Sequence, residues 1–206
     1  MTSHGAATTT LSRPFYARES VTVARALLGQ RLVRVLDGVR LAGRICETEA
    51  YGGPNDQASH AYRRTQRSSV MYGPPGIAYV YFIYGVHHCL NAVTEEDGVP
   101  GAVLIRALVP DEGLERMRGH RHLTLGSAGV STAVTRGLAD GPGKLCQALR
   151  ITIAENGVDL TASDHLFVEQ IAGVADDDVI TSPRIGVRGD DETRRRPWRF
   201  VWSPPR

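Results

Sequence analysis

The sequence predicts a single α+β domain with a mainly antiparallel sheet and peripheral helices. The chain has 206 residues, of which 42% are hydrophobic, and this is enough for one core but too little for two comfortable domains. Several β-forming runs are separated by short turns that contain Gly, Pro or Asp-Gly, a pattern typical of antiparallel strands. Two later segments with helical spacing lie beside these runs and complete the α+β pattern.

The N-terminal segment, residues 1–18, is expected to be flexible, and residues 19–206 are expected to form the domain. The segment is small and polar and has no continuous apolar run, so it does not resemble a signal peptide. No later stretch is long and apolar enough to span a bilayer. The three cysteines are widely spaced, which fits a reducing compartment better than a disulfide framework. We therefore expect a soluble, cytoplasmic protein with no membrane partner.

The first regular element is expected to be a helix in "SVTVARALLGQ", with Ser20 as its N-cap and Gly29 as its stop. Two β-rich runs follow, "RLVRVL" and "VRLAGRICETEAY". They are joined by Asp37-Gly38, a dipeptide that tolerates positive φ and favours a tight hairpin turn. These runs are therefore expected to form two antiparallel strands.

A polar stretch bounded by Gly and Pro, residues 52–76, comes next. Asn55 is a candidate cap for a short helix that continues through His60. Loops of this length in compact domains are often functional. Beyond it, strands are expected in residues 78–91 and 102–109. Helices are expected in "PDEGLERMRGHR" and "DGPGKLCQALRI", and a closing strand in "RPWRFVW".

The stretch "AYVYFIYGVHHCLN", residues 78–91, holds three of the chain's seven tyrosines. Successive strand residues point to opposite faces, so Tyr79 and Tyr81 share one face. Tyr84 falls out of step with them and is followed by Gly85, which permits a tight turn. The pattern predicts a hairpin with Tyr84 at its tip.

The basic residues are clustered although the formal net charge is only +2. Of the 24 basic residues, Lys144 is the one lysine, and the arginines gather in three groups. The groups are Arg63, Arg64 and Arg67; Arg116, Arg118 and Arg121; and Arg194–Arg196 with Arg199. Because arginine presents a planar fork suited to phosphate, the groups could form one face for nucleic acid. Codon bias in a GC-rich genome is the alternative explanation.

Motifs for phosphate loops and metal sites fail on their spacing. In "GLADGPGKL" five residues separate Gly137 from Gly143, and Leu145 replaces the Ser or Thr of a phosphate loop. The two histidine pairs, His87-His88 and His120-Arg-His122, lack the Cys-Cys or Glu-His partners that would complete a tetrahedral zinc site. Cys89 lies in an apolar run and is expected to be a simply buried cysteine. No metal is expected.

Glu47, Glu49 and Tyr51 alternate onto one face of their predicted strand, and a Gly-Pro turn could bring His60 back to it. A carboxylate beside an aromatic ring and a histidine could activate water, an effect of about 10²- to 10⁴-fold. The alternative is a solvated strand edge or an ion pair. The residues alone leave both readings open.

Four motifs in order, "ICETEAYGGPNDQASHA", "GPPGIAYVYFIYGVHHCLN", "AVLIRAL" and "GPGKLCQAL", resemble those of the alkyladenine (3-methyladenine) DNA glycosylases. The resemblance covers the chain from Ser20 to Trp202. It implies a curved sheet with a protruding β-hairpin. It also implies the hydrolytic removal of 3-methyladenine, 7-methylguanine, hypoxanthine and ethenoadenine from double-stranded DNA. A monofunctional enzyme without cofactor, metal or lyase activity is expected, monomeric by default and nucleoid-associated if bacterial.

The resemblance also assigns roles to residues in the pocket. Glu49 matches the general base, and Arg106 matches the arginine that holds water or phosphate beside it. Tyr51, Tyr81 and His60 match the side chains that line the base pocket. In the same way, Asn91 matches the asparagine that crowds the 2-amino group of guanine and so disfavours the normal base.

On the DNA side, Tyr84 matches the tyrosine that enters the minor groove and takes the place of the flipped nucleotide. Backbone contacts are expected from Arg63, Arg64, Arg67 and Lys144. The chain departs from the family pattern at three positions. Val86 replaces a frequent methionine, Ser68 a frequent asparagine and His88 a frequent aromatic residue.

Two other function classes remain as alternatives. A nucleic-acid binding module could use the same arginines and hairpin, but it would gain nothing from Glu49. A hydrolase of free nucleosides or sugars could use Glu49, but it would have no purpose for Tyr84 at a hairpin tip. Activity on duplex oligonucleotides and not on free nucleosides would separate these alternatives from a DNA glycosylase.

Overall fold

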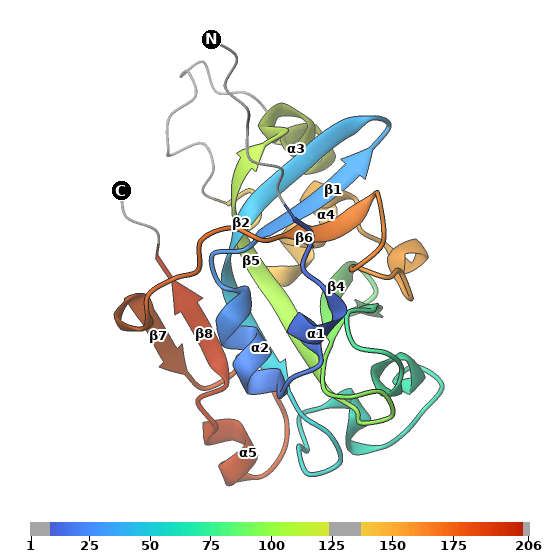
Figure 1. Cartoon of the computed structure of the whole chain (residues 1–206), viewed down its shortest axis with the longest axis vertical. Helices are drawn as coiled ribbons and strands as arrows, with labels where there is room; N and C mark the ends of the chain where they lie inside the picture. Colours follow the sequence, from blue (N-terminus) through green and yellow to red (C-terminus); the bar gives the residue numbers. More distant parts are fainter. Residues whose placement is uncertain (1–8, 124–136, 204–206) are drawn as a thin grey trace.

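The structure is a computed structural model that describes residues 9–123 and 137–203 (Figure 1). The α-helices in this part are α1 (Arg13–Tyr16), α2 (Ser20–Leu27), α3 (Leu114–His120), α4 (Pro142–Leu149) and α5 (Asp191–Arg195). Short 3-10 turns are η1 (His60–Tyr62), η2 (Ser69–Tyr72), η4 (Ile153–Glu155) and η5 (Asp176–Asp178). The strands are β1 (Arg31–Leu36), β2 (Val39–Tyr51), β3 (Ala78–Ile83), β4 (His87–Val93), β5 (Ala102–Glu112), β6 (Leu166–Glu169), β7 (Val179–Ser182) and β8 (Arg199–Trp202).

The strands form one antiparallel sheet in the order β3-β4-β5-β2-β1-β6, which confirms the predicted α+β class. The 13-residue β2 is the central strand. β5 lies along one side of it, and β1 and then β8 lie along the other. Register shifts interrupt the β2–β5 ladder, including two around Glu47. Such bulges bend a strand and increase its twist, which accounts for the curvature of the sheet.

Both predicted hairpin turns are present. Asp37 and Gly38 have φ values of 51° and 73° and join β1 to β2 with Leu36 opposite Val39. Tyr84 and Gly85 have φ values of 55° and 70° at the tip of the β3–β4 hairpin. Positive φ at both central residues is the pattern of the turns that match the twist of paired strands. For a tyrosine this conformation is unfavourable, so the tip stores strain.

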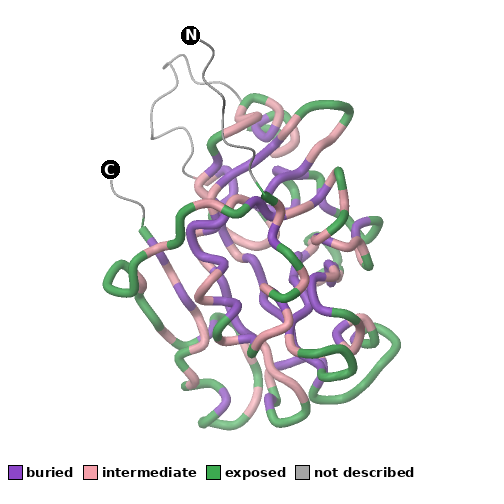
Figure 2. Tube along the Cα trace, viewed as in Figure 1, coloured by how far each residue is buried: buried purple, intermediate pink, exposed green. Residues whose placement is uncertain are grey.

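The main core lies between the sheet and the helices, where the chain trace is buried in Figure 2. Helix α2 packs over β2 and β5, and the hydroxyl of Thr48 donates to the carbonyl of Ala24 at 2.8 Å. Helix α4 packs on β4. A smaller cluster under the loop that follows β2 contains Ala61, Met71, Tyr79, Val93 and Ala102. The face of β2 that carries Glu47 and Glu49 is therefore the face opposite α2.

Helix α2 begins at Ser20, the residue that we expected to be its N-cap, and so starts one residue earlier than predicted. Ser20 is the first helical residue and Glu19 occupies the N-cap position without a side-chain bond. Instead, Glu95 accepts hydrogen bonds from the amide of Ser20 at 2.6 Å and from its hydroxyl at 2.7 Å. The cap is thus supplied from a distant loop. Gly29 follows the helix with a φ of 81°, as expected for a stop.

Two further expectations differ from the structure. The helix predicted from Asn55 to His60 is wrong: the segment forms turns, and the 3-10 turn at His60 is capped by Ser59. The carboxylate of Asp56 binds the amides of Gly52 and Ala58, which holds this segment in turns. Within residues 1–18, which we expected to be flexible, residues 1–8 lie outside the described part, whereas residues 11 and 16 are core leucine and tyrosine.

Candidate active site and DNA-facing surface

Two bulges place the polar side chains of β2 and β5 on one face. Along the ladder, Glu47 pairs with Ala107 while Thr48 pairs with Ile105, so Arg106 is the extra residue on β5. Bulges next to active sites commonly re-aim a side chain in this way. Arg106 consequently reaches both glutamates of β2. Its Nε donates to Glu47 at 2.7 Å, and its Nη1 lies 3.2 Å from Oε2 of Glu49.

The Glu49 side chain is completely buried, and three donors surround its carboxylate. The backbone amide of Ile185 donates to Oε1 at 2.7 Å. The hydroxyl of Tyr51 donates to Oε2 at 2.7 Å, and Arg106 forms the ion pair described above. A buried carboxylate needs such charged and hydrogen-bonding partners to stay ionised. The arrangement therefore provides a fixed negative charge at the end of β2.

The groups around Glu49 are held in their donor states. Burial raises the pKa of Tyr51 well above its ordinary value, and the charge of Glu49 raises it further. Burial also acts to lower the pKa of Arg106, but Glu49 and Glu47 outweigh it and the pKa is raised. Tyr51 thus stays protonated and Arg106 stays cationic. Arg199 joins the network by donating its Nε to Glu47 at 2.6 Å.

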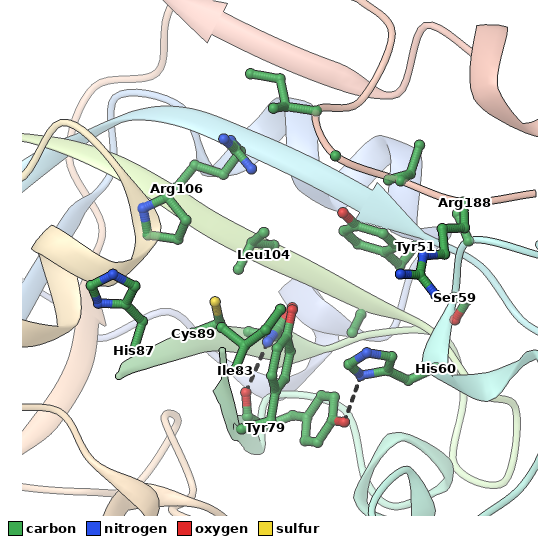
Figure 3. Close-up of a pocket in the computed structure, with 18 of the residues that line it drawn as sticks. Tyr51, Ser59, His60, Tyr79, Ile83, His87, Cys89, Leu104, Arg106 and Arg188 are labelled. Atoms are coloured by element: carbon green, nitrogen blue, oxygen red, sulfur yellow. Dashed lines mark hydrogen bonds between the residues drawn. The ribbon is translucent and has the colours of Figure 1, made fainter. Parts of the chain in front are cut away.

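A cavity of about 580 Å³ opens beside this network (Figure 3). Pockets of roughly 300–1,000 Å³ are typical for small organic groups. Its lining includes the three groups that contact Glu49, namely Tyr51, Arg106 and Ile185. Glu49 itself lies behind them and does not line the cavity. The other predicted pocket residues are in the lining as well: His60, Tyr81, Asn91 and, at the mouth, Tyr84.

An aromatic wall faces Tyr51 across the cavity. Tyr81 and His60 lie with ring centroids 4.6 Å apart, and Tyr79 lies 5.4 Å from Tyr81. Nδ1 of His60 shares a hydrogen bond of 2.8 Å with the hydroxyl of Tyr79, drawn as a dashed line in Figure 3. Burial and the nearby charge of Arg67 lower the pKa of His60 to about 4. The imidazole is therefore neutral at physiological pH.

Strand β4 contributes two cavity-lining residues next to this wall, Asn91 and Cys89. Asn91 is buried opposite Tyr79, and its side-chain amide donates to the Tyr79 carbonyl at 3.0 Å. Cys89, which we expected to be simply buried, is buried but also lines the cavity opposite Tyr81. Burial raises the pKa of its thiol. Tyr79, which was expected to share a face with Tyr81, likewise lines the cavity as the partner of His60.

Comparison with known proteins agrees with this geometry. The family model described as "Methylpurine-DNA glycosylase (MPG)" matches residues 14–205. The chain belongs to the methylpurine-DNA glycosylase family. A protein of Methanocella arvoryzae is 51% identical over 191 residues, with 92% of this chain and 90% of its own length covered. One of Bacillus cytotoxicus is 44% identical over 196 residues, with 92% and 94% covered. Both are named "Putative 3-methyladenine DNA glycosylase".

Family membership makes this protein a DNA glycosylase of the methylpurine type, and it gives the exposed hairpin a context. Tyr84 is 82% exposed, Val86 68% and Phe82 48%. Large apolar side chains that gather at one exposed point commonly mark an interaction site. Among the described residues, this tip is the place where three exposed large apolar side chains occur at alternate positions of one short segment.

The three arginine groups do not form one basic face. Figure 1 places α3 and α5, which carry two of the arginine groups, at opposite ends of the molecule. Their arginines are also neutralised locally: Arg116 pairs with Asp37, and Arg194 and Arg196 pair with acids of their own helix. Charges that are paired within a chain attract phosphate less strongly.

The remaining arginine group lies beside the cavity. Arg67 stacks over Tyr81 at 4.7 Å and donates to the carbonyl of Phe82 at 3.2 Å. Arg64 stacks over Tyr72 at 4.6 Å, and Arg63 lies 6.0 Å from the Tyr62 ring. These three arginines form no ion pair among the described residues. Lys144, at the start of α4, pairs with Asp140 at 2.7 Å next to the cavity-lining Gly143.

Sequence reasoning missed the C-terminal side of the site. The segment from Ile185 to Arg188 lines the cavity, and Arg184 is buried directly behind it. The segment "SPRIGVRGD" is rich in Pro and Gly, which is the available signal for an ordered functional loop. Across the described ranges, no cluster of His, Cys, Asp or Glu is suited to a metal ion. Nor is any helix there long and apolar enough to cross a membrane.

Proposed function

We propose that this glycosylase flips damaged purines out of double-stranded DNA and hydrolyses their N-glycosidic bond with a water activated by Glu49. The substrates are 3-methyladenine, 7-methylguanine, hypoxanthine and ethenoadenine. The observation that carries the proposal is the buried carboxylate of Glu49, paired with Arg106 directly behind a cavity with aromatic walls. A fixed negative charge at this point stabilises the oxocarbenium-like sugar that forms as the base leaves.

The cavity supports stacking of a flipped purine between Tyr51 and the wall of Tyr81 and His60. Alkylated purines that carry a positive charge gain electrostatically from aromatic faces. Neutral His60 offers a hydrogen-bonding nitrogen without repelling such a base. Asn91 is held in place by the Tyr79 carbonyl and crowds the position of a guanine 2-amino group. Tyr84 fills the gap in the duplex, and unstacking the base costs a few kcal/mol.

Because Glu49 lies behind the cavity lining, a water molecule must pass between Tyr51, Arg106 and Ile185 to reach its carboxylate. A carboxylate has about four lone-pair positions, and three donors occupy three of them. The remaining position is on Oε1, the oxygen that accepts from Ile185, and the reacting water takes it. Arg106 then orients the water while Glu49 accepts its proton.

The enzyme is proposed to be monofunctional and monomeric and to need no cofactor. A lyase step requires a neutral amine as nucleophile. Lys144 is the one lysine of the chain, and its ammonium group pairs with Asp140, whose pKa it lowers. A contact with the DNA backbone is the role that suits it. Trapping of a covalent protein–DNA complex by borohydride would contradict this part of the proposal.

The test is incubation with duplexes that carry 3-methyladenine, hypoxanthine or ethenoadenine, followed by alkaline cleavage at abasic sites. The wild-type protein should cleave these duplexes and leave the free nucleosides intact. Glu49→Gln should retain affinity for a duplex with an abasic-site analogue and lose about 10²- to 10⁴-fold in excision, as expected for loss of a general base. Wild-type rates in Glu49→Gln would show that the assignment of Glu49 is wrong.

A further inference from the structure

Arg184 is a charged residue in the loop between β7 and α5, yet its side chain is completely buried. All of its Nη contacts are made within the protein. Nη1 donates to the carbonyl of Ala50 at 2.9 Å and to Oδ2 of Asp56 at 2.6 Å. Nη2 donates to Oδ1 of Asp56 at 2.8 Å and to the carbonyl of Thr193 at 3.3 Å. One guanidinium thus joins the end of β2, the loop after it and helix α5.

The same guanidinium is stacked between two aromatic rings. Its Cζ lies 4.8 Å from the centre of the Tyr51 ring and 5.0 Å from that of Trp198. Tyr51 lines the cavity and Arg184 does not, so Arg184 covers the face of the Tyr51 ring that is turned away from the cavity. The ring that would stack on a flipped base is therefore supported from behind by a fixed cation.

Asp56 completes the arrangement from the other side. Its side chain is 1% exposed and, besides Arg184, accepts hydrogen bonds from the amides of Gly52 at 3.0 Å and Ala58 at 3.2 Å. The bidentate pair fixes both the distance and the plane of the two groups. It holds the loop that leads from Tyr51 toward His60.

Two of the three donors to Glu49 depend on this pair. Tyr51 is stacked on Arg184, and Ile185 is the next residue in the chain after it. We propose that Arg184, paired with Asp56, is a positioning residue that sets the Tyr51 hydroxyl and the Ile185 amide on the carboxylate of Glu49. It touches neither the reacting base nor the water. The inference rests on the proposed function of Glu49 and extends it to the residues that hold Glu49 in its working geometry.

The competing explanation is a purely structural ion pair. Removal of one partner from a buried pair leaves an uncompensated charge and can unfold the protein, whereas replacement of both partners is often tolerated. The test therefore uses the double variant Arg184→Met/Asp56→Asn. Its matched control is Arg34→Met/Glu155→Gln, because Arg34 and Glu155 form a similarly buried pair at 2.8 Å that lies outside the cavity lining.

Three quantities are measured on each protein: the single-turnover excision rate of hypoxanthine from a duplex, the affinity for a duplex with an abasic-site analogue, and the melting temperature. The Arg184 variant should lose about 30-fold or more in rate with affinity changed by less than about threefold. The control variant should keep its rate within about threefold.

The conservative variant Arg184→Lys sharpens the test. Lysine keeps the charge that Asp56 needs, so this variant should fold. It should still lose about tenfold in rate, because an ammonium group cannot stack on Tyr51 and bond to Ala50 and Asp56 together. A wild-type rate in the lysine variant, a loss of affinity as large as the loss of rate, or equal losses in the control would overturn the inference. If the wild-type protein removes no base, the proposed function falls and the inference with it; wild-type excision with unchanged variants refutes the inference alone.

Discussion

The two walls of the cavity differ in how their polar side chains are satisfied. The carboxylate wall, formed by Tyr51, Arg106 and Ile185, surrounds the completely buried carboxylate of Glu49 with three donors. The hairpin wall, formed by Tyr81 and Tyr84, ends in a tyrosine that is 82% exposed. Arg67, which stacks on Tyr81, forms no ion pair with any residue in the described part of the chain. The polar groups of the carboxylate wall have their partners within the protein, whereas the hairpin wall ends in a side chain that faces solvent.

This difference separates two kinds of function. Buried charges cost several kcal/mol unless their partners are in place, so the carboxylate wall contributes both to stability and to a preorganised site. Exposed side chains contribute little to folding, so the hairpin wall is free to serve a second molecule. Substitutions in the carboxylate wall should change the folding stability and the excision rate together. Substitutions in the hairpin wall should change DNA binding and excision from DNA but not the folding stability.

The largest effect is expected from Arg106→Gln. This change leaves Glu49 without its cation, and breaking a buried ion pair costs about 3–5 kcal/mol of unfolding free energy. Arg199→Gln is the control, because Arg199 also pairs with Glu47 but does not contact Glu49. It should cost about 1 kcal/mol or less. Urea unfolding of the two variants measures the difference, and equal losses would mean that Glu49 does not depend on Arg106.

The next effect is expected from Tyr84→Ala. Stacking of an aromatic side chain on bases is worth about 1–3 kcal/mol, which corresponds to roughly 5- to 150-fold in excision from duplex DNA. Excision from single strands should fall less, because no gap has to be filled there. Folding stability should stay within about 0.5 kcal/mol of wild type, as for other exposed positions. Equal losses on duplex and single strand would remove Tyr84 from the DNA-facing role.

A smaller effect is expected from His60, which packs against Tyr81 of the hairpin wall. Its pKa is about 4 in the folded protein and about 6.5 in the unfolded chain. The unfolded state therefore takes up the proton first, and the folded state loses stability as the pH falls from about 6.5 towards 4. The loss should be on the order of 1–2 kcal/mol, because solvent reaches part of the ring and screens it. Urea unfolding near pH 7.5 and pH 5 should show this difference in wild type and a smaller one in His60→Gln.

The smallest effect is expected from substitution of a single arginine in the group beside the cavity, Arg63, Arg64 and Arg67. Arg63→Ala should reduce the slope of log affinity against log salt by about 0.9 for duplex DNA, the contribution of one phosphate contact. Arg194→Ala should leave the slope unchanged, because Arg194 is paired with Asp191 in α5. Titrations of an undamaged duplex at several salt concentrations measure both. An equal change in the two variants would mean that the two arginines contact DNA alike.

Local signals in the sequence predicted much of the fold and one half of the site. Strand alternation brought Glu47, Glu49 and Tyr51 to one face, and the turns at Asp37-Gly38 and Tyr84-Gly85 are visible as dipeptides. In each case the residues that decide the structure are neighbours in the chain. Propensity and period-two patterning act over that range.

The other half of the site depends on contacts that no local pattern specifies. Asn55 carried a helix-capping signal, but the neighbouring Asp56 bonds to Arg184, 128 positions later, and this pair sets the loop. Ile185 reaches Glu49 through its backbone amide, which any residue except proline would provide. Arg106 could be placed on its strand, but the bulge that turns it towards Glu49 follows from pairing with β2.

The contact between Glu49 and Ile185 has a consequence for synthesis of the chain. The two residues are 136 positions apart, and translation at about 5–20 residues per second separates them by roughly 7–27 s. During that interval the carboxylate of Glu49 lacks a donor, and β2 lacks β8 from Glu47 to Glu49. A nascent chain therefore cannot complete the surroundings of Glu49 before Ile185 has left the ribosome.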